Sequence, residues 1–215
     1  MTRVVVRISE LSLETGVSIA TIKYYQREGL LPAGVATALR QADYGDAHVH
    51  RVRLIRTLRE VGGLEIERVR RVIEAIEADD VSRHELYGVA ARALEPVVRR
   101  QDIPEDVEAA RAEVDAFVNG RGWDVRTDAS PRAELADALV ALRRLGRDYG
   151  TEIFGPYADV ADRMAAWEVR TIPATDEPGV AVERMVVGTV IFERILNALR
   201  RMAQEHHSGK VHPGG

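Results

Sequence analysis

The residues from Ile8 to Pro32 constrain the fold of this chain most, because they place two short helical segments on either side of a tight turn. A serine or threonine before a helix caps its free N–H groups, and a glycine after a helix takes the left-handed conformation that ends it. The residues that supply this pattern are, in chain order, Ser9, Gly16, Val17, Ser18 and Gly29. The stretch therefore predicts a helix-turn-helix.

The second helix of this pair, expected over Ile19–Glu28, has one face for its partner helix and others for solvent. Ile22 and Gln26 are predicted to face the partner. The remaining faces combine small residues with a cation, a hydroxyl and phenols, namely Ala20, Thr21, Lys23, Tyr24 and Arg27. Small side chains let a helix backbone approach a duplex groove, while longer polar ones reach phosphate oxygens, so this helix is predicted to contact DNA.

At these residues the sequence resembles the N-terminal winged-helix domain of the MerR family of transcriptional regulators. TIKYYQREGLLP at Thr21–Pro32 is similar to a family signature, and HVHRVRLIRTLREVGGLEIERVRRVIE is similar to the two helices after the first wing. The resemblance covers roughly residues 7 to 77. Together, residue chemistry and resemblance give a set of candidate DNA contacts: Ser18, Ala20, Thr21, Lys23, Tyr24, Tyr25, Arg27, Arg40, Tyr44 and Arg59.

The wing departs from the family pattern. Where relatives read close to Gly-Tyr-Arg-x-Tyr, this chain reads Arg40, Gln41, Ala42, Asp43 and Tyr44. The usual wing arginine is missing, so the expectation is that Arg40 acts from a shifted position and that Tyr44 donates to a phosphate. The resemblance adds a role beside the DNA backbone for Arg59.

Length and periodicity predict a mainly α protein with two domains. With 215 residues, the chain can form a winged-helix domain at 1–78, a helical dimerisation and effector domain at 79–206, and a disordered tail at 207–215. The net charge of −4 divides into +2 for residues 1–78 and −6 for the rest. Polyanion binding depends on where cations cluster, and four arginines, Arg51, Arg53, Arg56 and Arg59, fall on one predicted helix.

Composition excludes several chemistries. The sequence contains no Cys, so thiol redox sensing and thiolate metal sites are ruled out. His206, His207 and His212 suggest a solvent-exposed helix end more than a metal site, and no metal or cofactor is expected. No catalytic motif is present, so an enzyme is not expected. The sequence has no apolar run of membrane-spanning length and no signal peptide, which predicts a cytoplasmic protein.

The second half reads as a series of helices without the long heptad helix that follows the wing region in many MerR-like proteins. The last helix, about Val180 to Gln204, is the most apolar and is predicted to be buried on most sides, either inside the domain or at a subunit interface. The layout loosely resembles TetR-like regulators. The candidate effector pocket consists of aromatic and thioether side chains, each of which a helical core would also need: Trp123, Phe154, Tyr157, Met164, Trp167 and Phe192.

The resemblance implies a regulator that binds a near-palindromic promoter operator as a homodimer and distorts double-stranded DNA so that RNA polymerase can use a poorly spaced promoter. The second domain would respond to a small organic effector. Two alternatives stay open: a ligand-independent repressor or architectural DNA binder, and a helical protein–protein adaptor whose winged helix docks a protein.

Overall fold

The computed structural model describes residues 6–38, 41–78, 86–95, 104–173 and 177–211. The fold is mainly α-helical, as predicted, and divides into two compact units. The first combines Met1–Leu94 with Thr175–Gly215, and the second is Glu95–Ala174. The last helix therefore joins the N-terminal unit. This division differs from the predicted boundary near residue 78, which grouped that helix with the middle of the chain.

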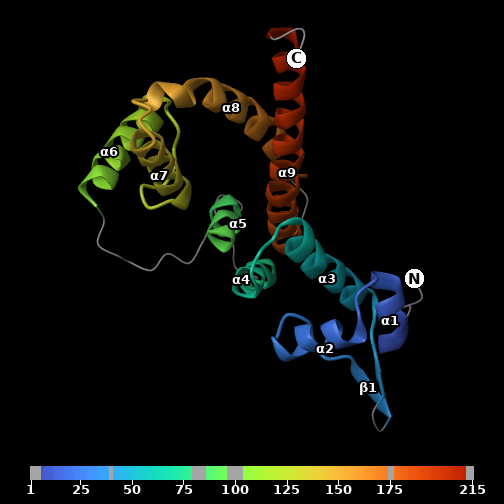
Figure 1. Cartoon of the computed structure of the whole chain (residues 1–215). Coiled ribbons are helices and arrows are strands. Elements are labelled where there is room, and N and C mark those ends of the chain that lie inside the picture. The colour runs from blue at the N-terminus through green and yellow to red at the C-terminus, as the bar shows by residue number, and fades with distance from the viewer. Residues whose placement is uncertain (1–5, 39–40, 79–85, 96–103, 174–176, 212–215) are drawn as a thin grey trace. The chain divides into compact units, whose positions relative to one another are not determined.

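The first unit begins with a helix-turn-helix and a two-stranded wing, followed by three helices and a π-helical turn (Figure 1). The elements are α1 Ile8–Thr15, α2 Ile19–Arg27, β1 Val35–Ala38, β2 Gln41–Asp43, α3 Asp46–Arg56, η1 Thr57–Val61, α4 Ile66–Glu77, α5 Leu86–Leu94 and, from the end of the chain, α9 Pro178–Val211. β1 and β2 are antiparallel, with Val35 opposite Asp43. An isolated bridge between Val6 and Tyr44 continues the pairing.

Local signals explain most of these boundaries. Gly16 ends α1 at φ 67° and Gly29 follows α2 at φ 71°, as the helix-stop pattern predicted. The first helix begins one residue before Ser9, and the carboxylate of Glu10 accepts a hydrogen bond from the Arg7 N–H at 2.8 Å, so Ser9 is not the cap. α3 continues into the π-helical η1, which ends at Gly62 and Gly63.

A continuous apolar core holds the first unit together. Leu11, Ile22, Val52, Ile55 and Leu58 are fully buried between the helix-turn-helix and α3. α4, α5 and α9 contact one another (Figure 1), and α9 supplies Ala181, Val182, Met185, Val186 and Val190. Within this single chain that face is buried only as far as Val190, so the predicted burial inside the domain holds for the N-terminal half, and the predicted subunit interface stays a prediction for the rest. The helix also extends through residues 207–211, which had been assigned to a disordered tail.

The second unit packs α6 Glu105–Gly120 against α7 Ser130–Arg144, followed by η2 Thr151–Phe154 and α8 Gly155–Arg170. Its core contains Ala110, Val114, Val118, Ala136, Leu139 and Val140. Arg132, only 6% exposed, ties the α6–α7 loop to this core. Its guanidinium donates to Asp115 at 2.7 Å, to the carbonyl of Arg126 at 2.9 Å and to that of Val125 at 2.7 Å.

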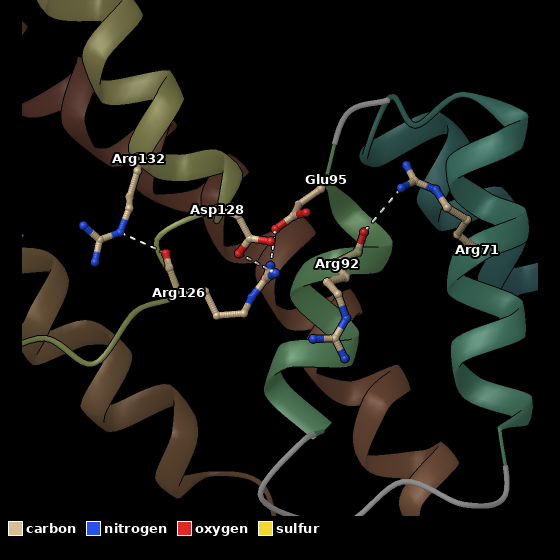
Figure 2. Close-up of polar contacts among 6 residues, drawn as sticks. All are labelled: Arg71, Arg92, Glu95, Arg126, Asp128 and Arg132. Carbon is tan, nitrogen blue, oxygen red and sulfur yellow. Dashed lines mark hydrogen bonds and ion pairs between the residues drawn. The ribbon is translucent and has the colours of Figure 1, made fainter. Parts of the chain in front are cut away.

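Figure 2 shows Arg126 and Asp128 of this loop together with Arg132. The Arg126 guanidinium bonds Asp128 at 2.9 Å and Glu95 at 2.8 Å, while its carbonyl accepts from Arg132. In the first unit, Arg71 on α4 donates to the carbonyl of Arg92 on α5 at 3.4 Å.

Candidate nucleic-acid interface

The second helix of the helix-turn-helix, α2, is held from one side by apolar contacts and from its N-terminus by a cap. Ile22 is fully buried and Tyr25 is 6% exposed. The Ser18 hydroxyl accepts a hydrogen bond from the Thr21 N–H at 3.1 Å and lies 2.8 Å from the Thr21 hydroxyl. This N-cap satisfies one of the free donors of the first turn and fixes where the helix begins.

The opposite side of α2 faces outward. Ala20, Lys23 and Arg27 are exposed, and Tyr24 is half-buried. These positions follow the i, i+3, i+4, i+7 spacing that puts residues on one helical face. The Arg27 guanidinium lies 5.8 Å from the centre of the Tyr24 ring, which is within cation–π distance. Predicted contacts Ser18, exposed, and Thr21, half-buried, lie at its N-terminal end.

Tyr25 and Tyr44, both among the predicted DNA contacts, lie inside the unit instead of on its surface. Tyr25 is buried on the inner face of α2, and this burial raises the pKa of its phenol. Tyr44 is 5% exposed, packs edge-on against His48 at 5.2 Å, and accepts a hydrogen bond from the Gln26 amide at 3.3 Å. Both rings therefore build the core that supports α2, and neither faces a groove in this structure.

The wing is anchored to the rest of the unit through Tyr44. Gly34 lies so close to the strand β2 that a Cβ there would stand 2.8 Å from the carbonyl oxygen of Asp43 and 3.0 Å from the Tyr44 ring. At the base of the wing, Arg7 pairs with Asp43 at 3.5 Å. Arg40, the predicted wing contact, lies outside the described residues.

The arginines of α3 are largely committed to partners within the unit. Arg51 pairs with Glu77 at 2.6 Å, Arg53 with Glu14 at 3.2 Å, and Arg56 with Glu60 at 2.8 Å. The predicted contact Arg59, in η1, is exposed, but its guanidinium donates to the carbonyl of Leu64 at 2.7 Å. Arg51, Arg53 and Arg56 thus join α3 to α4 and α1, and Arg59 bonds the loop before α4, so the predicted clustering of four arginines on one helix does not create a free basic surface.

The cations of α2 and α3 differ in whether a carboxylate pairs with them, and this difference decides which helix can attract a polyanion. Among the described residues, no carboxylate lies within ion-pair distance of Lys23 or Arg27, whereas each of the α3 arginines has one. A cation that already pairs with a carboxylate contributes less to attracting a polyanion than one that faces solvent alone. The outward face of α2 therefore offers the positive charge that can release counterions from a phosphate backbone.

The sequence did not reveal the carboxylates that pair with the arginines of α3. Two of them, Glu14 and Glu77, lie 39 and 26 residues from the arginines they bind. No local spacing signals such pairs. Only Arg56 and Glu60, four residues apart, show the helical i, i+4 spacing that could have identified the pair from the sequence.

The candidate effector residues are divided between the two units. Trp123, Phe154, Tyr157, Met164 and Trp167 lie in the Glu95–Ala174 unit, and Phe192 lies on α9 in the other. Trp123 and Phe154 pack against the core of their unit. The Trp123 indole donates to Asp162 at 2.9 Å, and Phe154 meets Phe117 at 5.8 Å between ring centres. Tyr157 and Trp167 are each 56% exposed.

The first unit contains a hollow of about 490 Å³ between the end of α1 and the α3–η1 segment. Its lining residues are Glu14, Thr15, Arg53, Arg56, Thr57, Glu60 and Val61, and its charged groups pair with each other across it. In the described part of the chain, no three His, Asp or Glu side chains form a group that could hold a metal ion. None of the described helices is both long and apolar enough to cross a membrane.

Comparison with known proteins identifies the fold around this surface. The model of the MerR HTH family regulatory protein matches residues 6–76. The crystal structure of SCO5550 from Streptomyces coelicolor A3(2), a candidate transcriptional regulator, is similar with a TM-score of 0.69 and 33% identity, over 95% of this chain and 97% of that one.

Two characterised regulators resemble the chain over a shorter span. The HTH-type transcriptional regulator HmrR of Sinorhizobium medicae (strain WSM419) is 27% identical over 54% of this chain and 78% of HmrR. The mercuric resistance operon regulatory protein of Bacillus cereus is 27% identical over 44% of this chain and 70% of that protein. With its helix-turn-helix and wing matched by the family model, and the likeness to a solved regulator extending over nearly both chains, the chain belongs to the MerR family of transcriptional regulators.

Proposed function

We propose that this regulator binds a promoter operator as a homodimer, with α2 of each copy in a major groove. The observation that carries the proposal is the outward face of α2, where Lys23 and Arg27 face solvent and no carboxylate of the described residues pairs with them, while the α3 arginines are paired. A single helix-turn-helix reads few base pairs, so two copies related by a twofold axis supply affinity and register.

Lys23 and Thr21 contact phosphates in this proposal, and Ala20 lets the α2 backbone approach the groove. Ser18, Tyr24 and Arg27 complete the DNA-facing set. Arg59 and Tyr44 take supporting positions, because the first bonds the carbonyl of Leu64 and the second bonds Gln26. Arg40 would act from the wing.

By analogy with its family, the dimer distorts the operator so that RNA polymerase can use the promoter. Protein–phosphate contacts would offset the elastic cost of bending and untwisting the duplex. The Glu95–Ala174 unit would bias this distortion by binding a small organic effector. Partly exposed aromatic side chains such as Tyr157 and Trp167 support an organic effector, and the lack of Cys in the sequence argues against a soft metal ion that requires thiolates.

The test is the salt dependence of binding to duplex DNA from immediately upstream of the reading frame, measured by fluorescence anisotropy. Wild-type affinity should fall steeply as salt rises, and Lys23→Ala should lower the slope of log K against log salt by about one. Arg53→Ala is the matched control, because its partner Glu14 already neutralises it. Binding that does not depend on salt, or equal effects of both variants, would contradict the proposed DNA-facing surface and favour a protein-docking adaptor.

The effector is tested separately with the tryptophans, both of which lie in the Glu95–Ala174 unit. A small organic molecule that raises the melting temperature, changes Trp fluorescence and alters operator affinity supports sensing. A dimer that binds the operator but shows none of these responses across a broad organic library would support ligand-independent regulation instead.

A further inference from the structure

The C-terminal end of α2 is held by two arginines from other helices of the first unit. Arg70 on α4 donates to the backbone carbonyl of Glu28 and to its carboxylate, both at 3.2 Å. Arg51 on α3 donates to the carbonyl of Leu30 at 3.5 Å and to Glu77 at 2.6 Å. The carbonyls at the end of a helix lack partners within the helix and form the negative end of its dipole, so these two cations stabilise the end of α2.

Arg70 differs from its neighbours on α4 in the helix that it contacts. Helical spacing places Arg70 on one side of the buried face of α4, and Arg68 and Arg71 on the other. Arg68 donates to the carbonyl of Leu94, and Arg71 to that of Arg92, both near the end of α5 (Figure 2 shows the second bond). Of these three arginines, Arg70 is the one that bonds α2.

The partner of Arg70 is a carboxylate beside the proposed DNA-facing residues. Glu28 is the only acidic residue between Ser18 and Leu31, and it directly follows Arg27. An unneutralised carboxylate at this place would repel phosphates and compete with them for the cations of α2. The Arg70 and Glu28 side chains are 37% and 35% exposed, so the pair is half-buried and lies where the charge of Glu28 would otherwise reach solvent.

We propose that Arg70 is a positioning residue for DNA binding, which fixes the end of α2 and neutralises Glu28 without contacting DNA itself. An arginine that bonds two groups of one residue fixes the orientation of that residue as well as balancing its charge. Arg27, which the proposed function places against DNA, is the next residue along the helix. This inference rests on the proposed function for the effect on DNA, but the hold on α2 can be measured without DNA.

Hydrogen exchange of the full chain, free of DNA, measures that hold. The amides of Glu28, Gly29 and Leu30 donate to carbonyls within α2. In Arg70→Ala these amides should exchange at least about fivefold faster, because the end of the helix opens more often. Arg68→Ala is the matched control, since it removes an arginine from the same helix whose partner lies on α5. It should leave exchange at the end of α2 unchanged within about twofold.

Operator affinity, measured by fluorescence anisotropy, tests the role of charge. Arg70→Ala should weaken binding by about tenfold, because the carboxylate of Glu28 then acts on the DNA uncompensated. In a Glu28→Ala background the same change should cost no more than about threefold, which is the non-additivity expected of two residues that act through each other. Arg68→Ala should bind like wild type. Far-UV circular dichroism of all variants checks that they remain folded.

A direct contact between Arg70 and a phosphate predicts a different pattern. The loss of affinity would be equal with and without Glu28, and the slope of log K against log salt would fall by about one in both backgrounds. That pattern would overturn the proposal, and so would exchange at the end of α2 that is unchanged in Arg70→Ala.

Failure of the proposed function gives a result that can be told apart from these. A wild-type chain that binds no duplex DNA would refute that function and with it the effect of Arg70 on DNA. Faster exchange in Arg70→Ala would in that case still support the hold of Arg70 on α2, and unchanged exchange would refute both.

Discussion

Gly179, in the first turn of α9, lies directly against the backbone carbonyl oxygen of Ile76 in α4. A second glycine, Gly62 at the end of η1, lies against a later turn of α9. A Cβ at Gly62 would stand 2.5 Å from the carbonyl oxygen of Leu58 and 2.7 Å from the Val190 side chain. Neither position has room for a side chain, because α9 lies too close to α4 at Gly179 and to η1 at Gly62. These two close approaches hold α9 against α4 and η1 of the first unit, so we expect this unit to lose stability when either glycine is replaced.

Gly179→Ala should destabilise the first unit by about 1–2 kcal/mol. The added methyl meets a backbone oxygen that cannot rotate away, and this overpacking should outweigh the better helix propensity of alanine. Hydrogen exchange of α4 and α9 in the full chain measures the loss. Gly209→Ala is the control, because nothing lies within 4 Å of a Cβ there, and it should be neutral or slightly stabilising. Equal protection in both variants would contradict a tight α4–α9 contact.

Arg132→Ala should destabilise the second unit by about 2–3 kcal/mol, because it removes a buried guanidinium and leaves the carbonyls of Val125 and Arg126 without a donor. Urea unfolding followed by Trp fluorescence reports this unit specifically. Arg144→Ala removes a pair whose side chains are 63% and 50% exposed, and it should leave stability nearly unchanged because solvent screens the pair. A small effect at both positions would show that Arg132 is dispensable for the loop.

The ion pair between Glu113 and Arg143 predicts a pH dependence in the same unit. Arg143 donates to both carboxylate oxygens of Glu113 at 2.7 and 2.8 Å, and these hydrogen bonds hold the pKa of Glu113 below its ordinary value. A carboxylate with a lowered folded-state pKa stabilises the fold above its unfolded-state pKa, and this contribution is lost as pH falls through the folded-state value.

Glu113→Gln should therefore be less stable than wild type at pH 7 and equal to it near pH 2. Because the Glu113 side chain is 40% exposed, solvent screening should keep the difference at pH 7 below about 1 kcal/mol. Urea titrations of both proteins across this range provide the measurement. A difference that is constant with pH would mean that the charge of Glu113 does not contribute.

Ile22→Ala should weaken operator binding without removing any of the residues proposed to contact DNA. Ile22 is fully buried on the inner face of α2, the helix that also carries Lys23. Truncating its side chain should lower the free energy of unfolding by about 2–4 kcal/mol and weaken the packing of this helix. Faster hydrogen exchange in α2, together with reduced operator affinity, is the expected result. Ile19→Ala, at a position that is 38% exposed, should leave exchange in α2 nearly unchanged.

The sequence by itself determined the local elements. The cap at Ser18, the left-handed glycines at Gly16 and Gly29, and the periodicity of α3 and α4 predict helices close to those observed, because each signal depends on residues within one or two turns. The outward position of Lys23 was also predictable, since the helical period separates it from Ile22. Helix caps and helical periodicity depend on residues that are close together along the chain, so they can be read from the sequence directly.

Only the tertiary structure decided which surfaces meet. The sequence showed that the last helix is the most apolar one but could not show that its first half packs in the first unit, with residues that are distant in sequence. The same limit hid the burial of Tyr44 and the pairing of Arg53 with Glu14. An apolar face can pack against many different apolar surfaces, and a charged side chain can pair with many different opposite charges. Which partner is used depends on how segments that are remote along the chain pack together.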